Sequence, residues 1–323
     1  MKYFFQRKIT VYFIIHMTTF KTMFTYNKEQ ITIDSISAFD LSAKGLNDKN
    51  NKTRENIIGA IINDKVPVEF YDIPRWLQIK NSVLKYITEL HETPYDKIEC
   101  KHKGGRKFNF DFNIIFYFQG LEPRVYNIEL KFNASTIDEA PQFVSPMKPS
   151  QYLSASYEDY YYTNYLNRLA ETATGLPLPS KEVYMAQIHT NKPKCVKDFQ
   201  ELYYQGCQAS SKFTNNETHI KFYEQAKQLS NESISSFIAQ TDLNIVLLSE
   251  YLQESQKGKI YMLYSDGNFT KQSADLKDYV ISSVVKNPQK FRYECLSENG
   301  KKISVLLRWK NGNGIAFPAF QIS

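Results

Sequence analysis

Cysteine and histidine are scarce in this sequence, and neither is spaced as a metal site. The 323-residue chain has four widely separated cysteines without a C-x-x-C pair, and five histidines without H-E-x-x-H or H-x-H spacing. A chain of this size does not need a disulfide scaffold, and zinc sites need closely spaced ligands. We therefore expect reduced thiols in a cytoplasmic location, and neither a histidine-based metal centre nor a catalytic triad.

Long hydrophobic runs are also missing. An apolar run at 9–15 follows three basic residues, but it is too short to span a membrane and lacks a small-residue cleavage site. A signal peptide and initiation at Met17 or Met23 both stay open for this segment. We assign 1–33 as an N-terminal extension that need not belong to the fold, and we expect no membrane partner.

Basic residues exceed acidic ones by only 40 to 34, which is weak evidence for a nucleic-acid partner. Apolar residues make up 42% of the chain, enough for one large domain or two modest ones. The distribution of charge says more, because one block sets five basic residues against the single acid Glu99: Lys97, Lys101, Lys103, Arg106 and Lys107. This block suits the approach of a phosphate backbone, although a solvated hairpin tip explains it equally well.

Apolar periodicity predicts a mixed α/β order in the first two thirds of the chain. The expected elements are a polar loop leading into a helix at 40–64, a helix at 74–91, strands at 97–103, 107–118 and 124–132, a tyrosine-rich helix at 150–172 and a strand at 183–189. Gly104-Gly105 and the Gly- and Pro-containing segment 119–123 predict tight connections between the three central strands.

Beyond residue 193 the pattern changes to helices followed by short strands. The expected elements there are helices at 196–208, 217–229 and 231–254, a strand at 259–264, and a C-terminal β-hairpin or meander at 290–296, 303–310 and 315–322. The predicted division is therefore a core at 34–193 and a C-terminal region at 194–323.

Polar side chains alternate with apolar ones on two of the central strands. Asp111 lies on the polar face of the strand at 107–118, and Glu129 with Lys131 lies on the polar face of the strand at 124–132. Because successive side chains of a strand point to opposite faces, two carboxylates and an ammonium can converge on one edge of a sheet. Carboxylates that hold Mg²⁺ lower the pKa of bound water. A nearby lysine can orient that water or stabilise developing charge.

The predicted metal ligands are Asp111, Glu129 and the backbone carbonyl of Leu130, with Lys131 as the water-orienting group. The bare pattern of an acid followed by [DE]-x-K occurs twice more in the chain. Asp72 precedes Glu99-Cys100-Lys101, and Asp266 precedes Asp275-Leu276-Lys277. Neither copy places both parts on adjacent alternating strands. The alternative for the favoured copy is a pair of solvated carboxylates with Lys131 as a surface ion-pair partner.

With these residues, the stretch 51–190 resembles the PD-(D/E)XK nuclease superfamily, to which many type II restriction endonucleases belong. The resemblance implies an α/β (α+β) fold with a restriction-endonuclease-like αβββαβ core and a mixed central sheet. It departs from the family pattern at Phe110, which stands where Pro is usual. Many members also use an acid from the first helix, for which Glu55 is the candidate; a first-turn glutamate favoured by the helix dipole is the alternative.

The resemblance implies a Mg²⁺-dependent DNA endonuclease, most simply a type II restriction enzyme acting as a homodimer on double-stranded DNA. No Walker loop is present, so we expect no nucleotide cofactor. Candidate DNA contacts are Lys101, Lys103, Arg106, Lys107, Lys301, Lys302 and Arg308. The last three also fit a solvated hairpin that completes a sheet. A junction resolvase, a recombination or repair exonuclease, a non-cleaving DNA-binding protein and an α/β protein with a coincidental motif are the alternatives.

Overall fold

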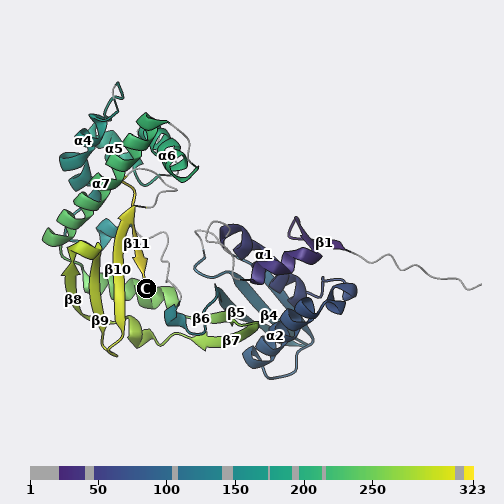
Figure 1. Ribbon diagram of the computed structural model, residues 1–323. Helices are drawn as coiled ribbons and strands as arrows, with labels where there is room; N and C mark the ends of the chain where they lie inside the picture. The colour runs from purple at the N-terminus through teal and green to yellow at the C-terminus, as the bar shows by residue number, and fades with distance from the viewer. Residues whose placement is uncertain are drawn as a thin grey trace, which may run out of the picture. The chain divides into compact units, whose positions relative to one another are not determined.

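The computed structural model describes residues 22–40, 47–103, 108–139, 148–173, 175–190, 196–212, 216–309 and 316–323. The chain divides into two compact units, 1–84 and 85–323. Figure 1 shows the elements of each unit along the chain. No helix within the described ranges is long and apolar enough to cross a membrane.

The first unit is built on a hairpin and a buried aromatic cluster. Its elements are β1 (Met23–Tyr26), β2 (Glu29–Thr32), η1 (Ile33–Phe39), α1 (Asn47–Ile62), η3 (Val68–Asp72) and the beginning of α2 (Pro74–Leu90). Phe70 packs edge-to-face on Phe24 at 5.2 Å and on Trp76 at 4.9 Å between ring centroids. The hairpin β1–β2 and the buried Phe24 show that part of the segment 1–33, expected to be an extension, belongs to the fold.

The second unit contains a five-stranded mixed sheet that is central to the candidate site. Its order is β3-β4-β5-β6-β7. The strands are β3 (Lys97–His102), β4 (Phe112–Phe118), β5 (Leu121–Phe132), β6 (Lys259–Ser265) and β7 (Asn268–Ser273). All neighbours are antiparallel except β5 and β6, which are parallel. The mixed α/β class with a central mixed sheet is therefore confirmed.

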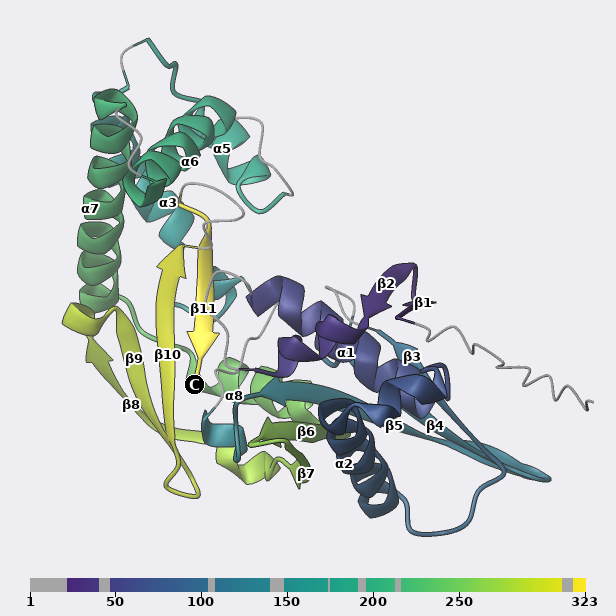
Figure 2. The ribbon, with the colours of Figure 1, turned by 45° about the vertical axis from the view of Figure 1, so that its right-hand side comes forward.

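A second sheet and most of the helices complete this unit. The antiparallel order is β11-β10-β9-β8 (Figure 2). These strands are β8 (Ile281–Asn287), β9 (Arg292–Ser297), β10 (Lys302–Trp309) and β11 (Pro318–Ile322). The longer helices are α6 (Lys197–Lys212), α7 (Glu217–Gln240) and α8 (Ile245–Gln256), and the shorter elements are η4 (Ile137–Glu139), η5 (Pro149–Gln151), η8 (Leu276–Tyr279) and η9 (Pro288–Lys290).

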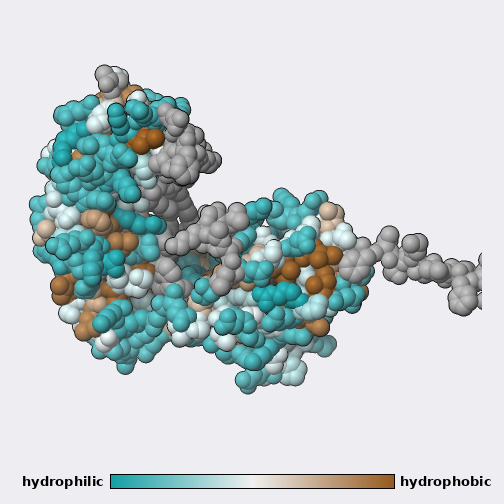
Figure 3. Space-filling view, in the orientation of Figure 1, coloured by the Kyte–Doolittle hydropathy of each residue, from teal (hydrophilic) through white to brown (hydrophobic). Residues whose placement is uncertain are grey.

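The tyrosine-rich segment is helical, but it begins later than expected and contains a π-turn. It consists of α3 (Tyr157–Tyr161), η6 (Tyr162–Leu166) and α4 (Asn167–Ala170). Tyr157 and Tyr161 are fully buried, and the Trp309 indole donates to the Tyr157 hydroxyl at 2.8 Å. The surface over α4–α7 is mostly hydrophilic in Figure 3. The described tyrosines thus serve mainly the core of this region.

The prediction of a strand at 183–189 is wrong, because this segment forms the helix α5 (Lys181–Gln187). The Ser180 hydroxyl caps the helix by accepting from the Val183 N–H at 3.3 Å. Tyr184 and Ile188 lie one turn apart, and both are fully buried. Helical spacing of the two buried residues therefore outweighs the strand-like composition.

The strand after the meander comes from much later in the chain. It is β6, which lies within the region that the sequence assigns to the C-terminal part, so the sheet crosses the predicted boundary at 193. The helix α2 and the three meander strands match their predictions to within a few residues, apart from the later beginning of β4. The C-terminal strands expected at 290–296, 303–310 and 315–322 appear as β9, β10 and β11.

Candidate functional site

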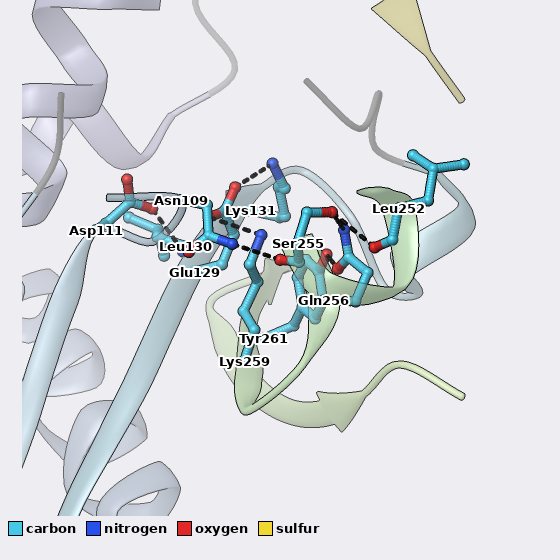
Figure 4. Close-up of polar contacts among 10 residues, drawn as sticks. All are labelled: Asn109, Asp111, Glu129, Leu130, Lys131, Leu252, Ser255, Gln256, Lys259 and Tyr261. Atoms are coloured by element: carbon cyan, nitrogen blue, oxygen red, sulfur yellow. Dashed lines mark hydrogen bonds and ion pairs between the residues drawn. The ribbon is translucent and has the colours of Figure 1, made fainter. Parts of the chain in front are cut away.

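The beginning of β4 and the second half of β5 bring the predicted carboxylates together. The pairing of Phe112 with Ile128 sets Asp111 opposite Glu129, and the Asp111 N–H donates to the Ile128 carbonyl at 2.9 Å. The Leu130 N–H donates to Oδ2 of Asp111 at 2.8 Å (Figure 4). Asp111 itself lies in the bend just before β4, so the predicted strand at 107–118 begins later than expected.

Two lysines flank the Glu129 carboxylate. Lys131 Nζ lies 2.7 Å from Oε1, and Lys259 Nζ lies 3.6 Å from Oε2. The Lys259 side chain is only 8% exposed, and those of Glu129 and Lys131 are each 17% exposed. The site therefore gathers two acids and two ammonium groups from three segments of the chain (Figure 4).

Lys259 is the functional candidate that sequence reasoning missed. It is the first residue of β6, and the parallel register places it beside Asn127 of β5. A strand at 259–264 is predicted from its apolar residues, but no local pattern indicates which strand lies beside it. The contact depends on a pairing between segments that are distant in sequence.

Burial and mutual repulsion shift the ionisation of this cluster. Burial, together with the negative charge of Glu129, raises the pKa of Asp111 to about 6, against the hydrogen bond from Leu130 and the charges of Lys131 and Lys259. Burial lowers the pKa of Lys259 although Glu129 opposes that shift. An additional positive charge near Asp111 would therefore favour its ionised form.

The bend that carries Asp111 is hydrogen-bonded to the last turn of α8, just before β6. The Asn109 side-chain amide donates to the Ser255 carbonyl at 2.6 Å. Gly258, with φ of 69°, follows α8 and lets the chain turn directly into β6. The buried Tyr261 hydroxyl donates to the side chain of Gln256 (Figure 4). These contacts fix the beginning of β6, and hence Lys259, next to the carboxylates.

The oxygen donors of the site suit Mg²⁺ with several positions left for water or substrate. Asp111 and Glu129 are hard oxygen ligands of the kind that Mg²⁺ prefers, and one or two carboxylates are usual for it. The Leu130 N–H faces Asp111, and a strand residue directs its N–H and C=O to the same neighbour, so the Leu130 carbonyl lies on this edge. Within the described ranges, no group of three or more His, Cys, Asp or Glu is placed to hold a metal.

The acids of the two competing copies of the motif, Glu99 and Asp275, are held by contacts within their own parts of the fold. In the first, the Tyr117 hydroxyl donates to Glu99 at 2.6 Å, and Lys101 lies 3.4 Å from the same carboxylate. In the second, the Asp275 side chain accepts from the Lys277 N–H at 3.0 Å and caps η8. Neither copy has both of its acids on paired strands, because Asp72 lies in η3 and Asp275 caps η8.

The other predicted residues are spread over several elements. Glu55 lies half-buried on α1, in the first unit, and its catalytic role stays a prediction. Lys101 is exposed, and the Lys103 ammonium lies 5.1 Å from the centre of the Phe108 ring. The Lys103 N–H donates to the Asp111 carbonyl at 2.8 Å, so the predicted basic block reaches the site through the backbone. Arg106 and Lys107 lie outside the described residues.

The predicted C-terminal contacts lie on or beside β10. Lys301 lies 2.6 Å from Asp138 and 3.7 Å from a carboxylate oxygen of Asp278, so two acids already hold its ammonium. Lys302 is exposed, and Arg308 is half-buried. Their contact with DNA stays a prediction.

Comparison of the chain with protein-family models, with curated proteins and with solved structures finds no match.

Proposed function

We propose that this protein is a Mg²⁺-dependent DNA endonuclease with a restriction-endonuclease-like core. The observation that carries the proposal is the meeting of Asp111, Glu129 and Lys131 on adjacent strands, with the Leu130 N–H donating to Asp111 at 2.8 Å. Two acids can hold a divalent cation that activates water, and a nearby lysine can stabilise the charge that develops on the phosphate, so these groups suit metal-assisted phosphodiester hydrolysis.

Each residue has a distinct role in the proposed reaction. Asp111, Glu129 and the Leu130 carbonyl would hold the cation, which when bound supplies an acidified water and a positive charge for the phosphate. Lys131 extends from the same strand face as Glu129 and would orient the attacking water or stabilise negative charge on the phosphate. Leu130 contributes its backbone to the site.

The order of elements also supports the proposal. Helix α2 precedes the antiparallel meander β3–β4–β5, and helix α8 precedes β6, which joins β5 in parallel. This is the αβββαβ order expected of restriction-endonuclease-like cores, with the segment between β5 and α8 as a long insertion. Within this class we favour a type II restriction endonuclease that acts as a homodimer on double-stranded DNA.

A plasmid assay tests the proposal. Purified protein is incubated with supercoiled plasmid of known sequence in Mg²⁺ or in EDTA, and the ends are mapped. We expect discrete fragments in Mg²⁺, no cleavage in EDTA, and loss of cleavage in Asp111→Asn, Glu129→Gln and Lys131→Met with DNA binding retained. Asp275→Asn, in the competing motif, is the matched control and should cleave like the wild type.

The other outcomes separate the remaining possibilities. Progressive shortening from ends would indicate an exonuclease, and cutting only at branched DNA would indicate a junction resolvase. Salt-dependent DNA binding without cleavage would indicate a binding protein on a nuclease scaffold. Wild-type cleavage by any of the three site variants would refute the assignment of the site.

A further inference from the structure

Lys259 brings a second buried ammonium to a carboxylate that already has a lysine partner. Lys131 lies 2.7 Å from one oxygen of Glu129, and Lys259 lies 3.6 Å from the other. Lysine is almost never buried unless it is paired. The pairing of Lys259 must therefore offset its removal from water.

The nearby Lys257 shows that distance alone does not explain this ion pair. Lys257 Nζ lies 3.6 Å from Glu254, the same distance as Lys259 from Glu129. Lys257 is 69% exposed, however, and Lys259 only 8%. A surface pair costs little desolvation, whereas an apolar residue would often stabilise a buried position as well as an ion pair does. Stability alone gives no reason for a lysine at 259.

The formal charges of the cluster supply that reason. When no cation is bound, the two negative charges of Asp111 and Glu129 cancel the two positive charges of Lys131 and Lys259. A divalent cation leaves the cluster with two positive charges. Attack by a hydroxide raises the charge of the phosphodiester from one negative charge to two, so a cluster with two positive charges matches the transition state. With a single lysine, the loaded cluster would match the ground state instead.

We propose that Lys259 is a catalytic residue that binds the scissile phosphate, and that it pairs with Glu129 only while no divalent cation is bound. This inference rests on the proposed nuclease function. The tie between Asn109 and Ser255, and the turn at Gly258, hold the beginning of β6 at the carboxylates. Lys259 and a divalent cation then compete for the same Glu129 oxygen.

Competition gives opposite effects on cation binding and on cleavage. In Lys259→Met, loss of the ammonium should tighten binding of Mn²⁺ alone about tenfold by calorimetry. Cleavage of plasmid with Mg²⁺ should fall about a hundredfold. Lys257→Met, which removes the exposed pair at the same distance, should match the wild type in both measurements. Lys259→Arg, which keeps the charge, should bind Mn²⁺ as weakly as the wild type.

The outcomes separate this inference from the proposed function. Wild-type cleavage by Lys259→Met overturns the role of Lys259 and leaves the nuclease function intact. Weaker Mn²⁺ binding by Lys259→Met, or tighter binding by Lys259→Arg, would show that the lysine has a structural role. Either result overturns the proposed role of Lys259. If the wild type binds Mn²⁺ and never cleaves DNA, the nuclease function and the phosphate contact fail together. Tighter binding by Lys259→Met would then support only the competition at Glu129. Circular dichroism and thermal melting establish that each variant is folded.

Discussion

Two acids of the second unit, Glu158 and Asp111, are buried, and their surroundings shift their pKa values in opposite directions. Glu158 is buried and accepts from the Ser156 hydroxyl at 2.9 Å, from the Ser150 hydroxyl and from the ring of His189. Burial alone would raise the pKa of Glu158, but the hydrogen bonds from His189 and Ser150 outweigh it and lower the pKa from its usual value. At Asp111, burial and the charge of Glu129 instead raise the pKa to about 6.

The difference lies in the neighbours of the two carboxylates. Donors surround the Glu158 carboxylate, so its charge is satisfied within the protein. Asp111 has another acid beside it, so the hydrogen bond from Leu130 and the charges of Lys131 and Lys259 satisfy its charge only in part. Perturbed acids of this second kind tend to occur at functional sites. Replacing each acid by its amide should therefore change the free energy of unfolding in opposite directions.

The largest expected effect is on cleavage by Asp111→Asn. The amide keeps the shape and can still accept from the Leu130 N–H, but it loses the negative charge that the proposed cation site needs. Cleavage should fall about a thousandfold or more, because a bound metal supplies several kcal/mol to phosphodiester hydrolysis. Plasmid cleavage rates measure this. Glu158→Gln, assayed at a temperature where it is folded, should retain cleavage; a comparable loss there would show that Asp111 has no special role in cleavage.

The next effect is on stability in Glu158→Gln. The amide cannot accept from all three partners of the carboxylate, and a buried donor is left poorly paired, at a cost of about 2–4 kcal/mol in the free energy of unfolding. Urea unfolding at pH 7 measures it against Glu250→Gln, an exposed control. Because the pKa of Glu158 is lowered by folding, its ionised form stabilises the protein above the unfolded pKa. The difference should shrink as the pH falls through the folded pKa.

Asp111→Asn should have the opposite and smaller effect on stability. Folding raises the pKa of Asp111 to about 6, so the folded state binds the proton more tightly and stability falls as pH rises through this value. An amide at position 111 does not ionise, so the variant keeps its stability as the pH rises. Without divalent cations, we expect it to raise the free energy of unfolding by about 1–2 kcal/mol at pH 8 and to have little effect near pH 4. Thermal melting at both pH values measures this, and equal effects at both would contradict the raised pKa.

The smallest effect concerns the hydrogen bond that Asn109, two residues before Asp111, donates to Ser255. Asn109→Ala removes the exposed hydrogen bond to the Ser255 carbonyl, worth about 1 kcal/mol, and loosens the bend that places Asp111. Cleavage should fall several-fold, by about the factor that this energy represents. Asn164→Ala removes a similar exposed bond to the Tyr160 carbonyl at 2.8 Å and should leave cleavage unchanged. Equal losses in the two variants would show that the tie has no special role.

Local patterns predict the part of the site that lies on consecutive strands. Alternation of polar and apolar residues places Asp111, Glu129 and Lys131 on one face, and a short turn brings the two strands together. The structure has these residues adjacent, with Asp111 just outside β4. Such a prediction succeeds because strand periodicity and a tight hairpin are both encoded within about 30 residues.

Distant pairings are not predicted in the same way. The segment VYMAQIH looks like the next strand, yet the cap at Ser180 and the burial of Tyr184 and Ile188 make it a helix. The strand that does join β5 begins at Lys259, and only the tertiary fold selects it. Lys259 therefore carries no local signal of its role.

The parallel pairing of β5 with β6 also has a consequence for how the protein forms. The chain between Phe132 and Lys259 holds the helices from α3 to α8, so this pair closes a very long loop. Contacts of such high sequence separation form slowly, and chains emerge from the ribosome N-terminus first. Asp111, Glu129 and Lys131 thus leave the ribosome well before Lys259 does. A nascent chain would carry an incomplete site until β6 has been synthesised and docked.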